Sequence, residues 1–167
     1  VLSLVGHAGE VLELWKLLEP EWGRAREIRH TQPFLTMREQ SQILRDERVR
    51  YSTLSDFEEL FPACVAMFTE EVGVSPIQYG SAAYRQRVNE VVTSRRSFIR
   101  IDGNEVIFKA EVGAIGNSIA QLQGVWVNPR YRGQGLAAPA ISAVVQFVLR
   151  DLANEVVYAN SYNTQAL

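Results

Sequence analysis

The feature that most constrains the fold is the segment Val125–Ala137, which reads VWVNPRYRGQGLA. It begins with the hydrophobic pattern of a strand, passes through a polar loop with two glycines, and leads into a helical pattern. The first N–H groups of a helix have no partner inside the helix and carry partial positive charge, so this arrangement indicates a phosphate-binding site. Gly133 and Gly135 would let an anion approach the backbone closely. Arg130 and Arg132 add positive charge and hydrogen-bond donors.

Two other kinds of phosphate-binding loop do not fit the segment. A Walker loop needs the string G-x-x-x-x-G-K-[ST], which does not occur in this sequence. A dinucleotide-binding fingerprint needs G-x-G-x-x-G, and here Gly133 and Gly135 are followed by Ala138, an allowed replacement for the third glycine. That fingerprint fails on its context, because the strands before it are predicted to form hairpins instead of a βαβ unit. An acyl-coenzyme A loop is the remaining candidate.

The sequence from Val49 onward predicts a mixed α/β sheet. The turn signals Asp102-Gly103 and Gly116-Asn117 separate strands that should pair antiparallel. The predicted order is one strand, two helices, three antiparallel strands, one helix and one strand. We expect strands at 49–53, 97–101, 105–112, 119–127 and 156–159, and helices at 55–71, 81–93 and 136–152.

Caps and prolines set the expected helix boundaries. Ser55 and Glu58 have the spacing of a capping box at the start of the first of these helices. Pro62 inside the same helix should produce a kink or divide it into two segments. Proline costs little only in the first turn of a helix. Because of Pro139, we therefore predict that the glycine loop extends to about Ala137 and that the helix begins there.

The first part of the chain is less regular. We predict that residues 1–48 are the remnant of an N-terminal region with a linker, and that a domain follows at 49–167. A helical pattern covers Gly9–Leu18 and should end at Pro20. The stretch Arg38–Arg50 is highly charged and indicates an exposed connection.

Composition argues against several classes of protein. A net charge of −2 gives no sign of a nucleic-acid partner. Cys64 is the single cysteine and the two histidines are isolated, so we predict neither a disulfide within the chain nor a metal site. No stretch approaches the ~20 apolar residues of a membrane helix, and no signal peptide opens the sequence. We therefore expect a cytoplasmic protein with no membrane partner.

The string Arg130–Gly135, RYRGQG, resembles the [RQ]-x-x-G-x-[GA] signature of the GNAT (GCN5-related N-acetyltransferase) superfamily. In that family the signature follows the fourth strand and opens the third helix, as in the order predicted above. Asn163–Ala166 resembles the N-x-x-A start of the family's fourth helix. The resemblance covers Val49–Leu167, and the residues before it are similar to the degenerate N-terminal region of two-part bacterial members. It implies an α/β GNAT fold, with a mixed, mostly antiparallel sheet flanked by helices.

The resemblance also implies acetyl-coenzyme A, or another acyl-CoA, as the co-substrate. In the family, loop amides hold the pyrophosphate and the strand before the loop pairs with the pantetheine arm. The next strand splays away to admit that arm, and residues beyond the splay often add contacts. The residues assigned to the acyl-CoA site in this way are Val125, Val127, Arg130, Arg132, Gly133, Gln134, Gly135, Leu136, Ala137, Asn160 and Asn163.

Acyl transfer to an amine needs a base for the ammonium proton and an acid for the leaving thiolate. Glu111 is the best candidate for the base, although a strand carboxylate that simply faces solvent is the competing interpretation. Gln121 and Gln123 lie where some family members carry a catalytic glutamate, and glutamine can only orient a water. In many members the acid is a tyrosine four residues after the alanine of N-x-x-A. That alanine is Ala166 here and the sequence stops at Leu167, so we expect a fold that is incomplete at its C-terminus.

The leading hypothesis is therefore an acyl-CoA-dependent N-acyltransferase that transfers an acyl group to a primary amine. The alternative is a coenzyme A-binding regulatory or interaction module without turnover. A structural domain with no ligand is the third possibility. The sequence specifies neither the amine acceptor nor an oligomeric state.

Overall fold

The computed structural model describes residues 4, 6–28, 30, 34–153 and 155–159. These residues fall into two compact units, one before Phe34 and one that spans Phe34–Ala159. The first unit holds the helix α1, Ala8–Trp22. The expectation that Pro20 ends this helix was wrong, since the helix continues for two further residues. Gly23 ends it instead, with a left-handed φ of 80° and an N–H that donates to the carbonyl of Glu19.

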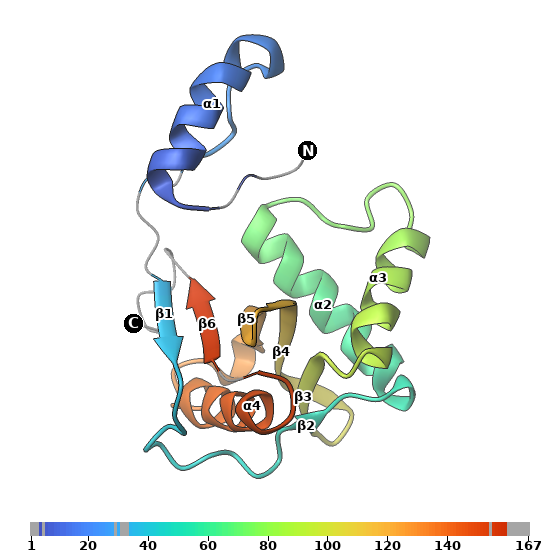
Figure 1. Cartoon of the computed structure of the whole chain (residues 1–167). Coiled ribbons are helices and arrows are strands. Elements are labelled where there is room, and N and C mark those ends of the chain that lie inside the picture. The colour runs from blue at the N-terminus through green and yellow to red at the C-terminus, as the bar shows by residue number, and fades with distance from the viewer. Residues whose placement is uncertain (1–3, 5, 29, 31–33, 154, 160–167) are drawn as a thin grey trace. The chain divides into compact units, whose positions relative to one another are not determined.

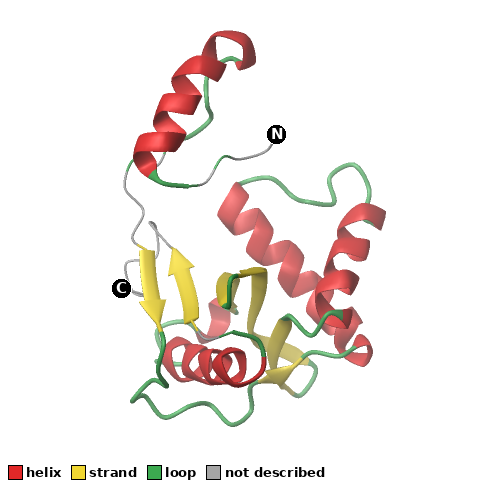
Figure 2. Ribbon diagram, in the orientation of Figure 1, coloured by secondary structure: helices red, strands yellow, loops and turns green. Residues whose placement is uncertain are grey.

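The second unit is built on a six-stranded sheet with the order β1-β6-β5-β4-β3-β2 (Figures 1 and 2). Only the pair of β5 and β6 is parallel, and the other neighbours are antiparallel. The predicted mixed, mostly antiparallel α/β sheet is confirmed. The strands are β1 (Phe34–Met37), β2 (Arg50–Tyr51), β3 (Ser97–Asp102), β4 (Glu105–Gly116), β5 (Ile119–Val127) and β6 (Glu155–Ala159).

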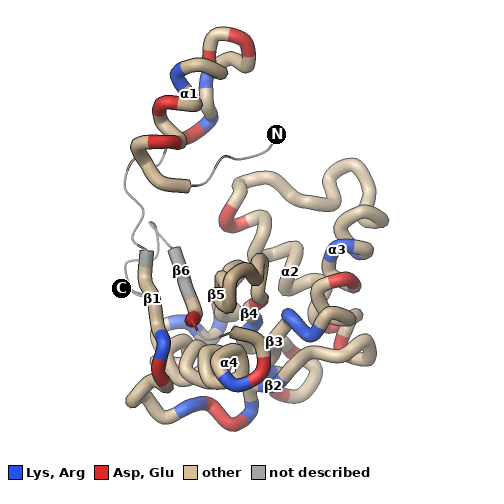
Figure 3. The backbone as a smooth tube through the Cα atoms, in the orientation of Figure 1, with Lys and Arg blue, Asp and Glu red and all other residues tan. Residues whose placement is uncertain are grey.

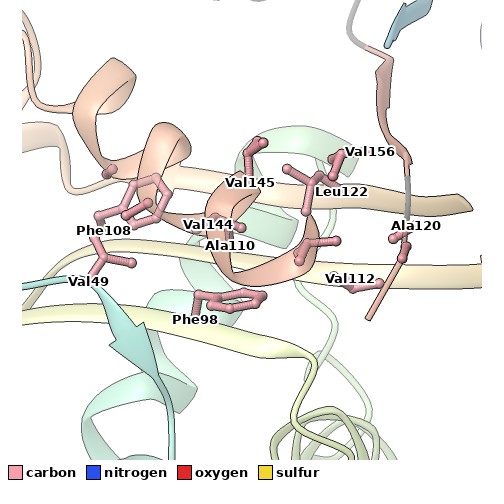
Figure 4. Close-up of a cluster of buried hydrophobic side chains, with 14 residues drawn as sticks. Val49, Phe98, Phe108, Ala110, Val112, Ala120, Leu122, Val144, Val145 and Val156 are labelled. Atoms are coloured by element: carbon pink, nitrogen blue, oxygen red, sulfur yellow. The ribbon is translucent and has the colours of Figure 1, made fainter. Parts of the chain in front are cut away.

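Helices cover both faces of the sheet. The helix α4 (Ala137–Asp151) lies on one face, where it packs on Phe98, Phe108 and other apolar side chains (Figure 4). The helices α2 (Phe57–Val72) and α3 (Ala82–Thr93) pack on the opposite face. Successive residues of a strand point to opposite faces, so β4 contributes Phe108 to the α4 side and Lys109 to the α2 side.

Two glycines introduce irregularities where β4 pairs with β5. Gly113 is the extra residue between the pairs Val112↔Leu122 and Ala114↔Gln121. Gly124 is one of two β5 residues opposite Ala110 alone, and it has a φ of 55° that favours glycine. A bulge of this kind bends and twists its strand. Both bulges flank the cross-strand pair of Glu111 and Gln123.

The helix α2 begins differently from the sequence prediction. The expected capping box of Ser55 and Glu58 was wrong, because Thr53 and Asp56 form the box around a short 3-10 turn, η1 (Leu54–Asp56). Asp56 forms the box because its carboxylate accepts both from the Thr53 N–H at 2.8 Å and from the Arg50 guanidinium at 2.7 Å. Pro62 does not divide the helix, which is continuous to Val72.

The start of α4 agrees with the prediction made from Pro139. The helix begins at Ala137, so Pro139 is its third residue and lies in the first turn. An N–H at this position would have no partner within the helix, so its absence costs no internal hydrogen bond. The boundary between the loop and the helix was therefore predicted correctly.

The charged connection between β1 and β2 is mostly exposed, as expected, and it also contacts α4. Its charges of both signs are visible along the tube in Figure 3. The N–H of Asp46 donates to the carbonyl of Pro139 at 3.0 Å, and Ser142 Oγ donates to the carbonyl of Ile43 at 2.8 Å. The carboxylate of Asp46 also lies 2.8 Å from the guanidinium of Arg100, whose side chain is buried. These contacts fix the connection to both the helix and the sheet.

The cap of α2 predicts a pH dependence of stability. Hydrogen bonds from Arg50 lower the pKa of Asp56 to about 2, from an ordinary value of 3.8. Because this pKa is lower in the folded chain, the stabilisation is complete above about pH 4 and is lost as the pH falls toward 2. We expect Asp56 to contribute about 2 kcal/mol to the loss in the free energy of unfolding between about pH 6 and about pH 2.5, measured by urea titration.

Asp56→Asn should remove this component and flatten the curve over the same interval. Glu58→Gln is the matched control, because Glu58 belongs to the same helix start but is largely exposed. An Asp56→Asn variant that keeps the pH dependence of the natural chain would contradict the assignment.

Candidate functional site

The loop after β5 is shaped by its own backbone and by Asn128. Asn128 Oδ1 accepts from the N–H of Arg130 at 3.1 Å and thereby caps the short 3-10 turn η2 (Pro129–Tyr131). The chain then passes through Gly133 and Gly135, whose φ angles of 74° and 73° are left-handed. Non-glycine residues adopt such angles at a cost, so the glycines fix the route of the loop into α4.

Free backbone donors line the end of this loop. From Gly133 to Ala138, no N–H donates a hydrogen bond to any residue that the structure describes. The first bond of α4 runs from Ala140 N–H to the carbonyl of Leu136. A Cβ atom added at Gly133 or Gly135 would meet no other atom within 4 Å, so the surface beside them is open. These donors lie at the positive end of the α4 dipole, which is a favourable place for an anion.

A carboxylate from the β3–β4 hairpin holds the first half of the loop. Glu105 Oε1 accepts from Asn128 Nδ2 at 3.0 Å and pairs with Arg130 at 3.1 Å. Glu105 Oε2 accepts from the hydroxyl of Tyr131 at 3.0 Å. Tyr131, which is not among the predicted binding residues, therefore anchors the loop. Sequence patterns gave no signal for this role of Glu105, which lies far away along the chain.

One edge of β5 pairs with another strand over only part of its length. β6 pairs with β5 only as far as Leu122↔Tyr158, and no described strand lies on that edge beyond this point. On the other edge, the N–H of Asn128 donates to β4 at the carbonyl of Ile107. Peptide groups alternate in direction along a strand. The Val125 carbonyl and the backbone N–H and carbonyl of Val127 therefore face away from β4. They form what we call the open edge of β5.

The side chain of Arg132 lies across this open edge. Its Nε donates to the carbonyl of Val127 at 2.9 Å, and its guanidinium pairs with Glu70 of α2 at 2.6 Å. Glu70 also accepts from Trp126 Nε1 at 3.3 Å. The end of α2, strand β5 and the loop thus meet at Glu70.

Glu111 lies in a mostly buried polar cluster on the α2 and α3 side of the sheet. Its carboxylate accepts from Gln123 Nε2 at 2.8 Å, pairs with Arg87 at 3.3 Å and lies 3.4 Å from Lys109 Nζ. The Lys109 side chain is 1% exposed and that of Glu111 is 14% exposed. Burial raises the pKa of Glu111, but the neighbouring ammonium, amide and guanidinium outweigh burial and lower it below its ordinary value. Glu111 is therefore not a solvent-facing strand carboxylate.

Backbone irregularity makes room for this cluster. A Cβ added at Gly113 would lie 2.0 Å from Gln123 Oε1, so only glycine leaves space for the amide that contacts Glu111. A Cβ added at Gly124 would lie 3.1 Å from both Lys109 Nζ and Met67 Cε. The two bulges thus place an ion pair beneath the point at which β5 leaves β6.

Solved structures of acetyltransferases are similar to this one. A GNAT-family acetyltransferase from Colwellia psychrerythraea aligns with a TM-score of 0.58 and 12% identity, over 81% of this chain and 49% of that one. A predicted acetyltransferase from Clostridium acetobutylicum, solved with acetyl-CoA, aligns with a TM-score of 0.55 and 12% identity, over 79% and 82%. AAC(6')-Iy, solved with the bisubstrate analogue CoA-S-monomethyl-acetylneamine, gives 0.54 and 18% identity, over 71% and 82%.

The chain has the GNAT fold. It spans 28% of the GCN5-related N-acetyltransferase from Kribbella flavida, which aligns over 64% of this chain with 18% identity and a TM-score of 0.46. Residues 1–60 match a family described as "Domain of unknown function (DUF4081)". No curated protein matches the chain.

The GNAT fold brings most of the predicted acyl-CoA residues to one place. Gly133, Gln134, Gly135, Leu136 and Ala137 carry the free amides, and Ala138, which the sequence analysis did not include, extends the set.

Two of the other predicted residues have partners of their own. The backbone N–H of Arg132 donates to the carbonyl of Pro129 at 3.4 Å, and the side chain of Arg130 pairs with Glu105. Asn160 and Asn163 lie outside the described residues.

Among the residues that the structure describes, no group of His, Cys, Asp and Glu side chains could hold a metal ion. No helix in this part of the chain has the length and apolar character needed to span a membrane.

The buried pair of Lys109 and Glu111 predicts a large stability effect. Glu111→Gln would leave the Lys109 ammonium buried without a carboxylate beside it, and removing one partner of a buried pair typically costs about 3 kcal/mol or more. Lys109→Met in the same chain should recover at least half of that loss, because an apolar side chain has no charge to bury. Urea titration of both single variants and the double variant measures the coupling, and purely additive effects would contradict it.

Proposed function

We propose that this protein is an N-acyltransferase that uses an acyl-CoA, with acetyl-CoA as the expected donor, and acylates a primary amine. The observation that carries the proposal is the run of free N–H groups from Gly133 to Ala138 beside the open edge of β5. An anion at the positive end of a helix and an extended chain beside a strand edge need these two features together. Coenzyme A supplies both, since its pyrophosphate is joined to an extended amide-containing arm.

The chain's own residues would bind the donor in two ways. The amides of Gly133, Gln134, Gly135, Leu136 and Ala137 would donate to the pyrophosphate, with Arg130 at the margin of this site. Val125 and Val127 would exchange hydrogen bonds with the pantetheine arm along the open edge of β5. We also keep Arg132, Asn160 and Asn163 as proposed contacts, the first as a charge close to the phosphates. The division into a leader of residues 1–48 and a domain of residues 49–167 stays a prediction.

The proposed reaction moves one acyl group from sulfur to nitrogen. The neutral amine attacks the thioester carbonyl, a C–N bond forms and the C–S bond breaks, and coenzyme A leaves as a thiolate that takes up a proton. The amine must first lose its ammonium proton to a base. Glu111 is our candidate for this role, with a water relaying the proton because the carboxylate is mostly buried. Gln123 would orient the carboxylate through its 2.8 Å hydrogen bond.

Gly133→Glu should abolish acetyl-CoA binding. The new side chain would force a residue with a Cβ into a left-handed conformation and place a carboxylate where the pyrophosphate belongs. We expect isothermal titration calorimetry to detect binding to the natural chain and none to the variant. Acetyl-CoA should also raise the melting temperature of the natural chain alone.

Gly103→Glu is the matched control for this experiment. Gly103 has a φ of 63° and open space at its Cβ position, as Gly133 does, but it lies in the β3–β4 turn. Equal loss of binding in both variants would mean that backbone strain, not the phosphate site, is responsible. Binding without release of free thiol across a panel of amines would support the coenzyme A-binding module without turnover.

Glu111→Gln should lower kcat about 100-fold or more while the Kd of acetyl-CoA stays within about twofold, since general base catalysis typically contributes that much. The assay is run at a temperature where circular dichroism shows the variant to be folded. An unchanged kcat would remove Glu111 as the base. The alternative would then be a base outside the cluster.

A further inference from the structure

The side chain of Arg132 occupies the open edge that the proposed function assigns to the pantetheine arm. Arg132 Nε donates to the Val127 carbonyl at 2.9 Å, and that carbonyl faces away from β4. A strand-like arm on the same edge would seek the same acceptor. The guanidinium is bulky and planar, so it and the arm cannot occupy this position together.

Glu70 holds Arg132 in this position from the opposite side. Its carboxylate accepts from Arg132 at 2.6 Å through Oε2 and from Trp126 Nε1 at 3.3 Å through Oε1. Both of its oxygens are therefore used, and the indole fixes its orientation. Trp126 is buried and belongs to β5 itself, so the contact joins α2 to the strand next to the open edge.

Arg130 has a separate partner and does not share this contact. It pairs with Glu105, the first residue of β4. The two arginines of the loop thus have different glutamates, and only the Glu70 pair lies across the open edge. Arg132 and Glu70 are 47% and 43% exposed, and ion pairs with such exposure are weak enough to exchange readily.

We propose that Glu70 sets the affinity for acyl-CoA by holding Arg132 across the open edge of β5, so that binding must break the Glu70–Arg132 contact. The released guanidinium is then close to the free amides at the start of α4 and adds its charge to the phosphate site. This inference rests on the proposed function. Through Glu70, α2 opposes acyl-CoA binding until the donor breaks the contact with Arg132.

The test compares coenzyme A binding by titration calorimetry in chains that differ at Glu70. Glu70→Gln removes the charge while keeping the shape, so we expect the Kd for coenzyme A and for acetyl-CoA to fall about three- to tenfold. Glu71→Gln is the matched control, because Glu71 is the next residue of the same helix end and has no contact with Arg132 among the described residues. It corrects for the general effect of removing a negative charge near an anionic ligand.

A double-variant comparison separates the contact from charge alone. In an Arg132→Gln background, Glu70→Gln should change Kd no more than Glu71→Gln does, because the contact is already absent. The melting temperature of each variant without coenzyme A shows whether stability has changed. A Glu70→Gln effect equal to that of Glu71→Gln, or one that persists without Arg132, overturns the inference. If the natural chain and every variant fail to bind coenzyme A, the proposed function fails as well.

Discussion

The site depends on backbone groups that the fold leaves without internal partners. Buried polar backbone groups are normally satisfied within helices and sheets, whereas most of the residues that carry the free amides here are exposed. Here the parallel pairing of β5 and β6 ends at Leu122↔Tyr158. The loop that follows β5 and the start of α4 carry backbone N–H groups that donate to no described residue. The bulge at Gly124 bends β5 at this point. Because β5 bends away from β6 here, one edge of β5 is exposed next to the start of α4.

Residues remote in sequence control this exposed region. Glu105 holds the loop from the β3–β4 hairpin, and Glu70 reaches it from α2. Beneath β5, Lys109 and Glu111 form a buried pair on the other side of the strand from the apolar cluster around α4. Carboxylates from two different elements, Glu105 of β4 and Glu70 of α2, therefore contact a loop that is itself rich in donors. Each carboxylate pairs with one arginine of the loop, Glu105 with Arg130 and Glu70 with Arg132.

Local patterns predicted the parts of this site that depend on neighbours in sequence. The glycine loop, the hairpins and the start of α4 at Ala137 follow from turn chemistry and from the position of Pro139. The capping box was misplaced because Arg50, six positions before Asp56, decides which carboxylate is used. The end of α1 was misplaced because Pro20 was given more weight than Gly23.

Burial of Lys109 and the Glu70–Arg132 contact were not predicted. They arise from packing between segments that are distant in sequence, and the hydrophobic periodicity of a single helix or strand does not predict such contacts. The pairing of β1 with β6 was not predicted either, because β1 lies within the predicted leader.

The connection from β1 to β2 has a consequence for where this fold can be divided. Asp46 provides one of the two carboxylates around the buried guanidinium of Arg100, and its N–H also meets the carbonyl of Pro139 at the start of α4. A chain that began at Val49 would keep every residue of the glycine loop. It would lose the Asp46 carboxylate that pairs with Arg100, the hydrogen bond from Asp46 to the first turn of α4, and the edge strand β1. The compact unit that contains the loop accordingly includes the residues from Phe34 onward.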